Sequence, residues 1–190
     1  MGAKMKLLTY QEAADALLRG EVIAYPTEGV YGFAADAMNR AAVEKLLQMK
    51  ARSVSKGFIV MGASLAHLSP LIEPLEAEEA RHLLEELRGG YRYTWIVPAK
   101  ESCPHYLRGE FPTLAIRVTN HPDALALCEK MPVGVVSTSA NLHKEAPLES
   151  AEAIYQIFGD QIAGVMEGAV GSLSSPTRIV HLKSGEIIRA

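Results

Sequence analysis

The sequence has few cysteines, no long apolar run and no closely spaced set of metal-ligating side chains. Cys103 and Cys128 are its two cysteines, and neither has a second cysteine or a histidine at zinc-ligand spacing. A single disulfide between them is the alternative, but we expect two buried thiols and no structural zinc. No apolar run approaches the roughly 20 residues that span a bilayer, and residues 1–8 lack the apolar region of a signal peptide. These absences favour a cytoplasmic protein without a membrane segment.

Several familiar catalytic motifs are also missing. There is no G-x-x-x-x-G-K-[ST] phosphate loop, no G-x-G-x-x-G fingerprint and no G-x-S-x-G elbow. The six histidines are scattered without metal-type pairing, and we expect His82 and His181 to be structural or solvated. The net charge of -3 argues against a uniformly basic nucleic-acid binder but leaves room for a local basic groove.

The length and the apolar content indicate one domain over residues 1–190. Hydrophobic residues make up 48% of the chain, which is enough to bury a substantial core. Apolar periodicity and capping signals alternate between helices and strands, but no helix is expected between residues 97 and 114, so the sheet should be mixed. The expected helices are 10–19, 40–50, 76–87, 122–130 and 150–158, and the expected strands are 21–25, 58–61, 91–97, 114–118, 133–136, 179–181 and 187–188.

Two stretches combine polar or charged residues with the ends of expected elements. Residues 26–32 place Thr27, a carboxylate and two glycines after an apolar strand, which suits either a ligand loop or an ordinary turn with a capping threonine. Lys50, Arg52 and Lys56 follow a helix, where cations either complement the helix dipole or clamp a polyphosphate. We expect Lys50 and Arg52 to be exposed groove residues.

Two further stretches add hydrogen-bonding groups and one unusual charge. Ser137, Ser139 and Asn141 crowd the expected exit of a buried strand, and they exceed what a single turn requires. Arg117 interrupts the apolar strand 114–118, where it either faces solvent by alternation or receives a carboxylate. The stretch 174–178 indicates a turn into an edge strand.

Taken together, these stretches resemble the YrdC-like family, in particular its short bacterial members. The resemblance covers about residues 8–190, and the order and spacing of the motifs hold throughout. The matching residues are Tyr25-Pro26-Thr27-Glu28, Val30-Tyr31-Gly32, Lys50-x-Arg52 with Lys56-Gly57, Thr94, Pro98, Leu114–Val118, His121-Pro122 and Ser137–Asn141.

The resemblance implies a fold and a reaction. The fold would be an α/β domain with a twisted mixed sheet, flanking helices and a large concave basic surface. The reaction would be that of a nucleotidyltransferase: L-threonine, bicarbonate or CO2, and ATP give threonylcarbamoyl-adenylate and pyrophosphate. Magnesium would bridge the phosphates without a metal site of protein ligands. A separate transferase complex would then use the product for the t6A modification of tRNA, and direct contact with tRNA is left open.

The resemblance also implies roles for individual residues. The centre of the catalytic site would be formed by Lys50, Arg52, Ser139 and Asn141. These four would bind ATP, together with Thr113 and Arg189. L-Threonine would be bound by Thr27, Arg117, Ser137 and Thr177, with Arg117 on its carboxylate. The chain departs from the family pattern at Ser53, at 89–93 and at 142–144, which would border the nucleotide.

Two other classes of function stay open at this point. A concave basic surface could serve a non-catalytic RNA-binding or tRNA-binding module, although the net charge and the lack of interleaved aromatic residues weaken that interpretation. A carbamoyl-transfer relative that uses carbamoyl phosphate is the third alternative. Steep salt dependence of RNA binding would identify the module, and activity without threonine would identify the carbamoyl-transfer enzyme.

Overall fold

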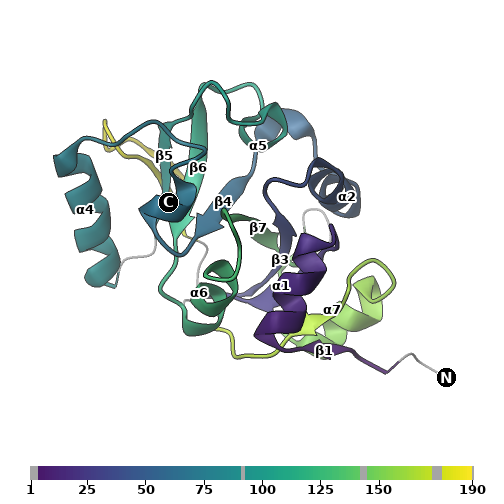
Figure 1. Ribbon diagram of the computed structural model, residues 1–190. Coiled ribbons are helices and arrows are strands. Elements are labelled where there is room, and N and C mark those ends of the chain that lie inside the picture. Colours follow the sequence, from purple (N-terminus) through teal and green to yellow (C-terminus); the bar gives the residue numbers. More distant parts are fainter. Residues whose placement is uncertain (1–3, 91–92, 142–144, 173–176, 190) are drawn as a thin grey trace.

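A mixed β-sheet of ten strands with helices on both faces forms the α/β fold that the sequence predicts (Figure 1). The computed structural model describes residues 4–90, 93–141, 145–172 and 177–189. The strands are β1 (Leu7–Leu8), β2 (Ile23–Pro26), β3 (Tyr31–Asp36), β4 (Ile59–Gly62), β5 (Tyr93–Pro98), β6 (Thr113–Val118), β7 (Val135–Ser139), β8 (Val165–Met166), β9 (Arg178–His181) and β10 (Ile187–Arg189).

The order of the strands places the two ends of the chain at opposite edges of the sheet. This order is β1-β8-β2-β3-β7-β4-β6-β5-β9-β10. The parallel pairs are β1–β8, β2–β8, β4–β6 and β5–β9, and the antiparallel pairs are β2–β3, β3–β7, β4–β7, β5–β6 and β9–β10. The prediction of a mixed sheet is therefore confirmed. Strands β7, β4 and β6 lie side by side in the middle, although they come from distant parts of the chain.

The helices begin where side chains cap their first turns. Thr9 and Glu12 form the capping box that the sequence predicts, and Asn39 accepts a hydrogen bond from the amide of Ala42. The helices are α1 (Tyr10–Leu18), α2 (Arg40–Lys50), α3 (Leu65–Leu68), α4 (Ala77–Arg88), α5 (His105–Arg108), α6 (Pro122–Cys128) and α7 (Ala151–Phe158), with a 3-10 turn η1 (Val54–Lys56).

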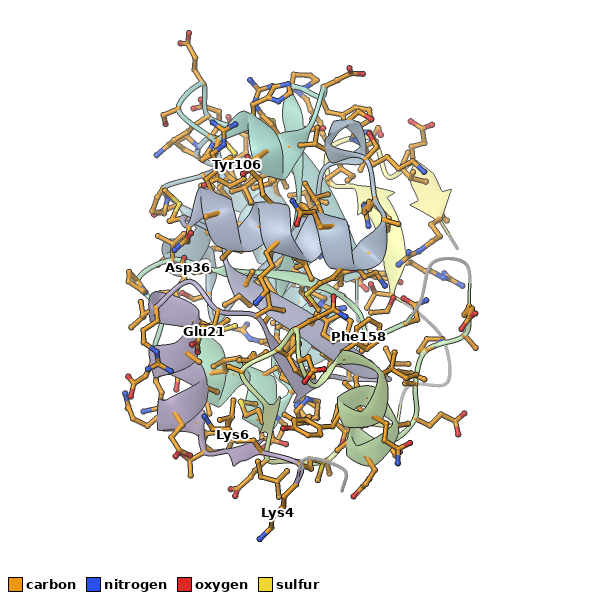
Figure 2. All side chains as sticks on the ribbon, turned by 90° about the vertical axis from the view of Figure 1, so that its right-hand side faces the viewer. Lys4, Lys6, Glu21, Asp36, Tyr106 and Phe158 are labelled. Carbon is orange, nitrogen blue, oxygen red and sulfur yellow. The ribbon has the colours of Figure 1, made fainter. Side chains whose placement is uncertain are left out.

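Alternation along the strands divides the buried side chains between two cores. In β2, Ile23 and Tyr25 belong to the core under α1 and α6, which we call the first face. Ala24 belongs to the core under α2, α4, α5 and α7, which we call the second face. In Figure 2, α2 crosses the second face between Tyr106 of α5 and Phe158 of α7. Ser137, Met61 and Arg117 all come from the first face of their strands.

Several elements differ from the expectations, and β1, β8 and α3 were not predicted at all. Residues 31–36 were not predicted as a strand, because glycine and alanine have low strand propensity, yet β3 pairs on both sides with β2 and β7. The four-residue helix α5 lies between β5 and β6, where no helix was expected. Ser137, Thr138 and Ser139 lie inside β7 and not beyond its end, since pairing with β3 continues to Ser139.

The two cysteines lie in the interior of the protein, as the sequence predicts. Cys103 and Cys128 are both free and buried, and burial raises the pKa of Cys128 to about 12. Within the residues that the structure describes, no helix is long and apolar enough to cross a membrane.

Gly109 is a position where the backbone requires glycine, and we predict that Gly109→Ala destabilises the protein. Its φ is +65°, and an added Cβ would lie 2.3 Å from the carbonyl oxygen of Ser55 and 2.8 Å from the amide of Gly57. Left-handed backbone costs about 1–3 kcal/mol in other residues, and the overlap adds to this cost. We expect the melting temperature to fall by roughly 5–10 °C.

The matched control is Gly185→Ala. Gly185 has a φ of +72°, but an added Cβ there meets nothing within 4 Å. This variant therefore measures the backbone cost without the overlap. Equal losses in the two variants, measured by calorimetry, would show that the contact of Gly109 with η1 does not matter.

Candidate functional site

The ammonium group of Lys50 lies inside the protein and holds the segment that follows β7. Lys50 is the last residue of α2 and only 7% exposed. Its Nζ donates to the carbonyl oxygens of Ser139 (2.7 Å) and Asn141 (2.9 Å) and to the side-chain Oδ1 of Asn141. The Asn141 amide in turn donates to the carbonyl oxygen of Glu145 at 2.7 Å. The expectation of an exposed Lys50 was therefore wrong: its three N–H groups fix the shape of the loop.

Arg52 lies two residues further on, where the chain leaves α2. Ala51 adopts a left-handed conformation with φ 47°, which turns the chain after the helix. One Arg52 N–H donates to the carbonyl oxygen of Gly57 at 2.8 Å, and the guanidinium lies 5.2 Å from the centre of the Phe58 ring. Its Nε is buried and finds no hydrogen-bond partner in the described part of the chain. Arg52 thus keeps part of its donor set for another molecule.

Lys50, Arg52, Arg189 and Arg117 lie close enough for each charge to affect the pKa of the one before it, and we call these four residues the row of cations. Burial, followed by the nearby charge of Arg52, lowers the pKa of Lys50 to about 8. Burial and Arg189 lower the pKa of Arg52, and burial and Arg117 lower that of Arg189. The positive charge of each residue therefore destabilises the charged form of its neighbour. An anion with several negative charges relieves this repulsion, so its binding is favoured.

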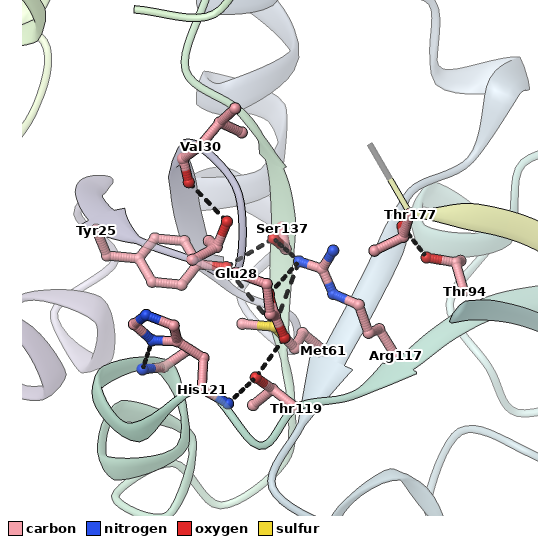
Figure 3. A network of polar contacts seen from close by, with 12 residues as sticks. Tyr25, Glu28, Val30, Met61, Thr94, Arg117, Thr119, His121, Ser137 and Thr177 are labelled. Atoms are coloured by element: carbon pink, nitrogen blue, oxygen red, sulfur yellow. Dashed lines mark hydrogen bonds and ion pairs between the residues drawn. The ribbon is translucent and has the colours of Figure 1, made fainter. Parts of the chain in front are cut away.

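Arg117 is the centre of a buried polar network on the first face (Figure 3). Its side chain is 12% exposed and comes from the middle of β6. One terminal N–H lies 3.5 Å from the hydroxyl of Ser137 and 3.7 Å from the carboxylate of Glu28. The Ser137 hydroxyl also forms a 2.6 Å hydrogen bond with the hydroxyl of Tyr25, whose pKa is raised by burial. Arg117 therefore faces inward, as a carboxylate receptor would.

Glu28 and Thr119 extend this network toward α6. The Thr119 hydroxyl donates to Oε1 of Glu28 at 2.7 Å, and the amide of His121 donates to the Thr119 hydroxyl at 3.1 Å. Burial alone would raise the pKa of Glu28, but the charge of Arg117 and the Thr119 hydrogen bond outweigh it, so the pKa is lowered. Glu28 is thus a buried, ionised carboxylate at neutral pH.

A pair of buried threonines links β5 to the residue before β9. The hydroxyls of Thr94 in β5 and Thr177 lie 2.9 Å apart, and both side chains are buried. Arg189 of β10 donates to the carbonyl oxygen of Thr177 at 2.8 Å. Residues 94 and 177–178 are far apart in the sequence, and the pairing of β5 with β9 brings them together. The C-terminal strands therefore bring Arg189 to the same site as Arg117.

The structure brings several of the predicted site residues together in two clusters. Lys50, Ser139 and Asn141 share one cluster, and Arg117 and Ser137 share the other. Thr113 lies on β6 four residues before Arg117 and, by strand alternation, on the same side. The Thr27 hydroxyl donates to the carbonyl oxygen of Val30 at 2.6 Å. Thr27 therefore stabilises a turn, which is the alternative role that the sequence left open for it.

Some of the residues that complete the site were not assigned a role from sequence. Glu28 and Tyr25 were only part of a motif, and Thr119 was not singled out at all. A carboxylate directly after a buried apolar strand was the available signal for Glu28, but its partners come from β6 and the segment after it. The departures at 142–144, part of those at 89–93 and most of the stretch 174–178 lie outside the described residues.

The lowered pKa of Lys50 gives a prediction about pH. An anion favours the protonated amine, so inorganic triphosphate should bind best below pH 8 and progressively less well as pH rises toward 9. In Lys50→Arg the charge persists over this range, so affinity should depend less on pH. Calorimetric titration from pH 7 to 9 measures this, and identical pH profiles for the two proteins would contradict it.

Sequence comparisons place the chain among proteins of one family. The Sua5/YciO/YrdC family model, described as "Telomere recombination", matches residues 15–190. A threonylcarbamoyl-AMP synthase of Coxiella burnetii is 38% identical over 178 residues, which cover 94% of this chain and 95% of that protein. A threonylcarbamoyl-AMP synthase of Haemophilus influenzae is also 38% identical, over 94% of this chain and 97% of that protein.

Solved structures agree on the fold. Sua5 of P. abyssi, in complex with L-threonine, superposes with a TM-score of 0.82 at 24% identity, over 96% of this chain and 56% of that protein. YciO of E. coli gives a TM-score of 0.81 at 20% identity, over 98% of this chain and 95% of that protein. The present chain therefore corresponds to a little over half of Sua5 and to nearly all of YciO.

Proposed function

This chain belongs to the Sua5/YciO/YrdC family, and we propose that it is a threonylcarbamoyl-AMP synthase. It would make threonylcarbamoyl-AMP and pyrophosphate from L-threonine, bicarbonate or CO2, and ATP. The observation that carries this proposal is the row of four cations, which connects a loop of hydrogen-bonding groups to a buried arginine. A polyphosphate and a small carboxylate suit the two ends of such a row. The names of the curated relatives support the same activity.

The chemistry needs positioning and charge stabilisation. The amine of threonine adds to CO2 and loses a proton to give a carbamate, and a carbamate oxygen attacks the α-phosphate of ATP so that pyrophosphate leaves. With bicarbonate as the carbon source, one water molecule is also released. Negative charge accumulates on phosphate oxygens, so fixed cations and N–H donors stabilise the transition state without a covalent protein nucleophile.

We assign the ATP to the cluster around Lys50. Arg52 and Arg189 would contact the phosphates directly, since Arg52 keeps a donor without a partner and Arg189 is exposed. Lys50 would contribute its charge and hold the segment Ser139–Asn141, whose hydroxyl and amide groups would complete the nucleotide site. Thr113, on the same side of β6 as Arg117, would border the reacting phosphate.

We assign the threonine to the network around Arg117. Its carboxylate would lie against the guanidinium, where Ser137 is already within 3.5 Å. Thr27 and Thr177 would close the pocket from the two sides, and the Thr94–Thr177 hydrogen bond would keep the second of them in place. The carboxylate of the amino acid and the phosphates of ATP would then meet along the row of cations.

Magnesium, the partners and the location complete the proposal. Among the described residues, no group of three His, Cys, Asp or Glu side chains could hold a metal ion, so Mg2+ would arrive on the nucleotide phosphates. The product would pass to the proteins of the t6A transferase complex, which modify tRNA. Two buried free thiols fit the reducing cytoplasm, where this pathway would run.

The test is pyrophosphate release from ATP in the presence of bicarbonate and Mg2+, with and without L-threonine. We expect release that depends on threonine and a product with the mass of threonylcarbamoyl-AMP. Release without threonine but with carbamoyl phosphate would favour the carbamoyl-transfer alternative. Folded protein that releases no pyrophosphate and binds RNA with steep salt dependence would favour the RNA-binding module.

A further inference from the structure

The buried carboxylate of Glu28 uses only one of its two oxygens. Its side chain is 5% exposed, and Oε1 accepts the hydrogen bond from Thr119. Oε2 is buried and finds no hydrogen-bond partner among the residues that the structure describes. Its nearest cation is Arg117, at 3.7 Å, which is longer than the roughly 2.7–2.9 Å of a charge-assisted hydrogen bond.

The other member of this ion pair is equally incomplete. The Nε of Arg117 is buried without a hydrogen-bond partner in the described part of the chain. Of its two terminal nitrogens, Nη2 makes only long contacts, 3.5 Å to the Ser137 hydroxyl and 3.6 Å to the sulfur of Met61. Two buried charges that are only loosely paired are unfavourable, because their desolvation is not offset by good hydrogen bonds. The Glu28–Arg117 ion pair therefore contributes little to the stability of the fold, and its geometry suits a role in binding.

His121, which lies close to Glu28 in Figure 3, has other partners. Its Nδ1 accepts a hydrogen bond from the amide of Ala124 at 3.4 Å, and its Nε2 lies 2.9 Å from the carbonyl oxygen of Ala169. The tautomer protonated on Nε2 satisfies both contacts. The histidine ring thus caps α6, and it leaves the free oxygen of Glu28 for another donor.

Space for such a donor exists next to Glu28. A cavity of about 280 Å³ is lined by Glu28, Asn120, His121 and Gly171, among others. This is far more than the ≈ 30 Å³ that one water molecule occupies in the liquid. Glu28 therefore borders a space that is large enough for a small amine.

We propose that Glu28 binds the α-ammonium group of the amino-acid substrate while Arg117 binds its carboxylate. The proposal rests on the proposed function and adds the residue that recognises the amine. A zwitterion carries an ammonium group, which suits the carboxylate of Glu28, and a carboxylate, which suits the guanidinium of Arg117. One small molecule can therefore pair with both residues at once. Glu28 makes the site select an α-amino acid over the corresponding hydroxy acid. Its role is binding, because the amine reacts with CO2 only after it has lost a proton.

The experiment compares two ligands that differ only at the amine. L-Threonine and 2,3-dihydroxybutyrate of matching configuration are titrated calorimetrically into the wild type and Glu28→Gln, with and without a non-hydrolysable ATP analogue. Glutamine keeps the shape and the acceptor for Thr119 but removes the charge. We expect the wild type to prefer threonine at least about tenfold, and Glu28→Gln to lose about tenfold in affinity for threonine while its affinity for the hydroxy acid stays the same or rises.

Controls separate the possible outcomes. Glu101→Gln removes one carboxylate from the exposed turn after β5 and should bind both ligands as the wild type does. Equal loss for both ligands in Glu28→Gln would overturn the proposal, since Glu28 would then act only by orienting Arg117. Equal affinities of the wild type for the two ligands would overturn it without any variant. A wild type that binds no threonine would overturn the proposed function as well.

Discussion

Lys50→Ala is expected to lower the rate of pyrophosphate release about 100- to 1,000-fold and to lower the stability of the fold at the same time. Fixed donors that stabilise charge in a transition state contribute effects of this size. The loss of stability follows because three acceptors on Ser139 and Asn141 lose their common cation. The Ser139 carbonyl and the Asn141 Oδ1 each keep one other donor, so we expect a cost of about 1–3 kcal/mol in total. Steady-state kinetics and calorimetric unfolding measure the two effects.

Two further variants keep these effects apart. Arg52→Ala should lower turnover to a similar degree with a smaller change in melting temperature, since Arg52 makes one hydrogen bond to the Gly57 carbonyl. Lys45→Ala is the matched control, because this lysine is exposed on α2 and should leave both rate and stability unchanged. Near-normal rates in both Lys50→Ala and Arg52→Ala would remove these residues from the ATP site.

Arg117→Ala is expected to raise the KM for threonine far more than the KM for ATP. A charge-assisted contact to a carboxylate contributes about 1.5–3 kcal/mol, which corresponds to a factor of roughly 10–150 in affinity. The substitution also leaves Glu28 buried without its cation, so the pKa of that carboxylate should rise. Kinetics with each substrate varied in turn measure the effect.

The control for Arg117 is Arg178→Ala. Arg178 is an exposed arginine at the start of β9, so its removal changes the net charge equally but not the buried network. It should leave both KM values close to those of the wild type. If Arg117→Ala instead loses ATP affinity selectively, Arg117 contacts the nucleotide and the two ends of the site must be exchanged.

The sequence was sufficient for features that depend on local patterns. The capping box at Thr9 and the cap at Asn39 were readable because each needs only three or four consecutive residues. The order of the motifs around Lys50, Arg117 and Ser139 was enough to indicate the family. The alternation of helix and strand patterns was enough to predict an α/β fold with a mixed sheet, and the number and spacing of the cysteines were enough to predict two buried thiols.

Other features were decided only by the tertiary structure, because they depend on partners far apart in the chain. Strand β3 exists because β2 and β7 pair with it, although its own residues favour strands weakly. Lys50 is buried because β7 brings the carbonyl groups of Ser139 and Asn141 to its ammonium, 89 and 91 residues away. The incomplete ion pair of Glu28 and Arg117 forms where the segment after β2 meets the middle of β6, and no periodicity in the sequence encodes that meeting.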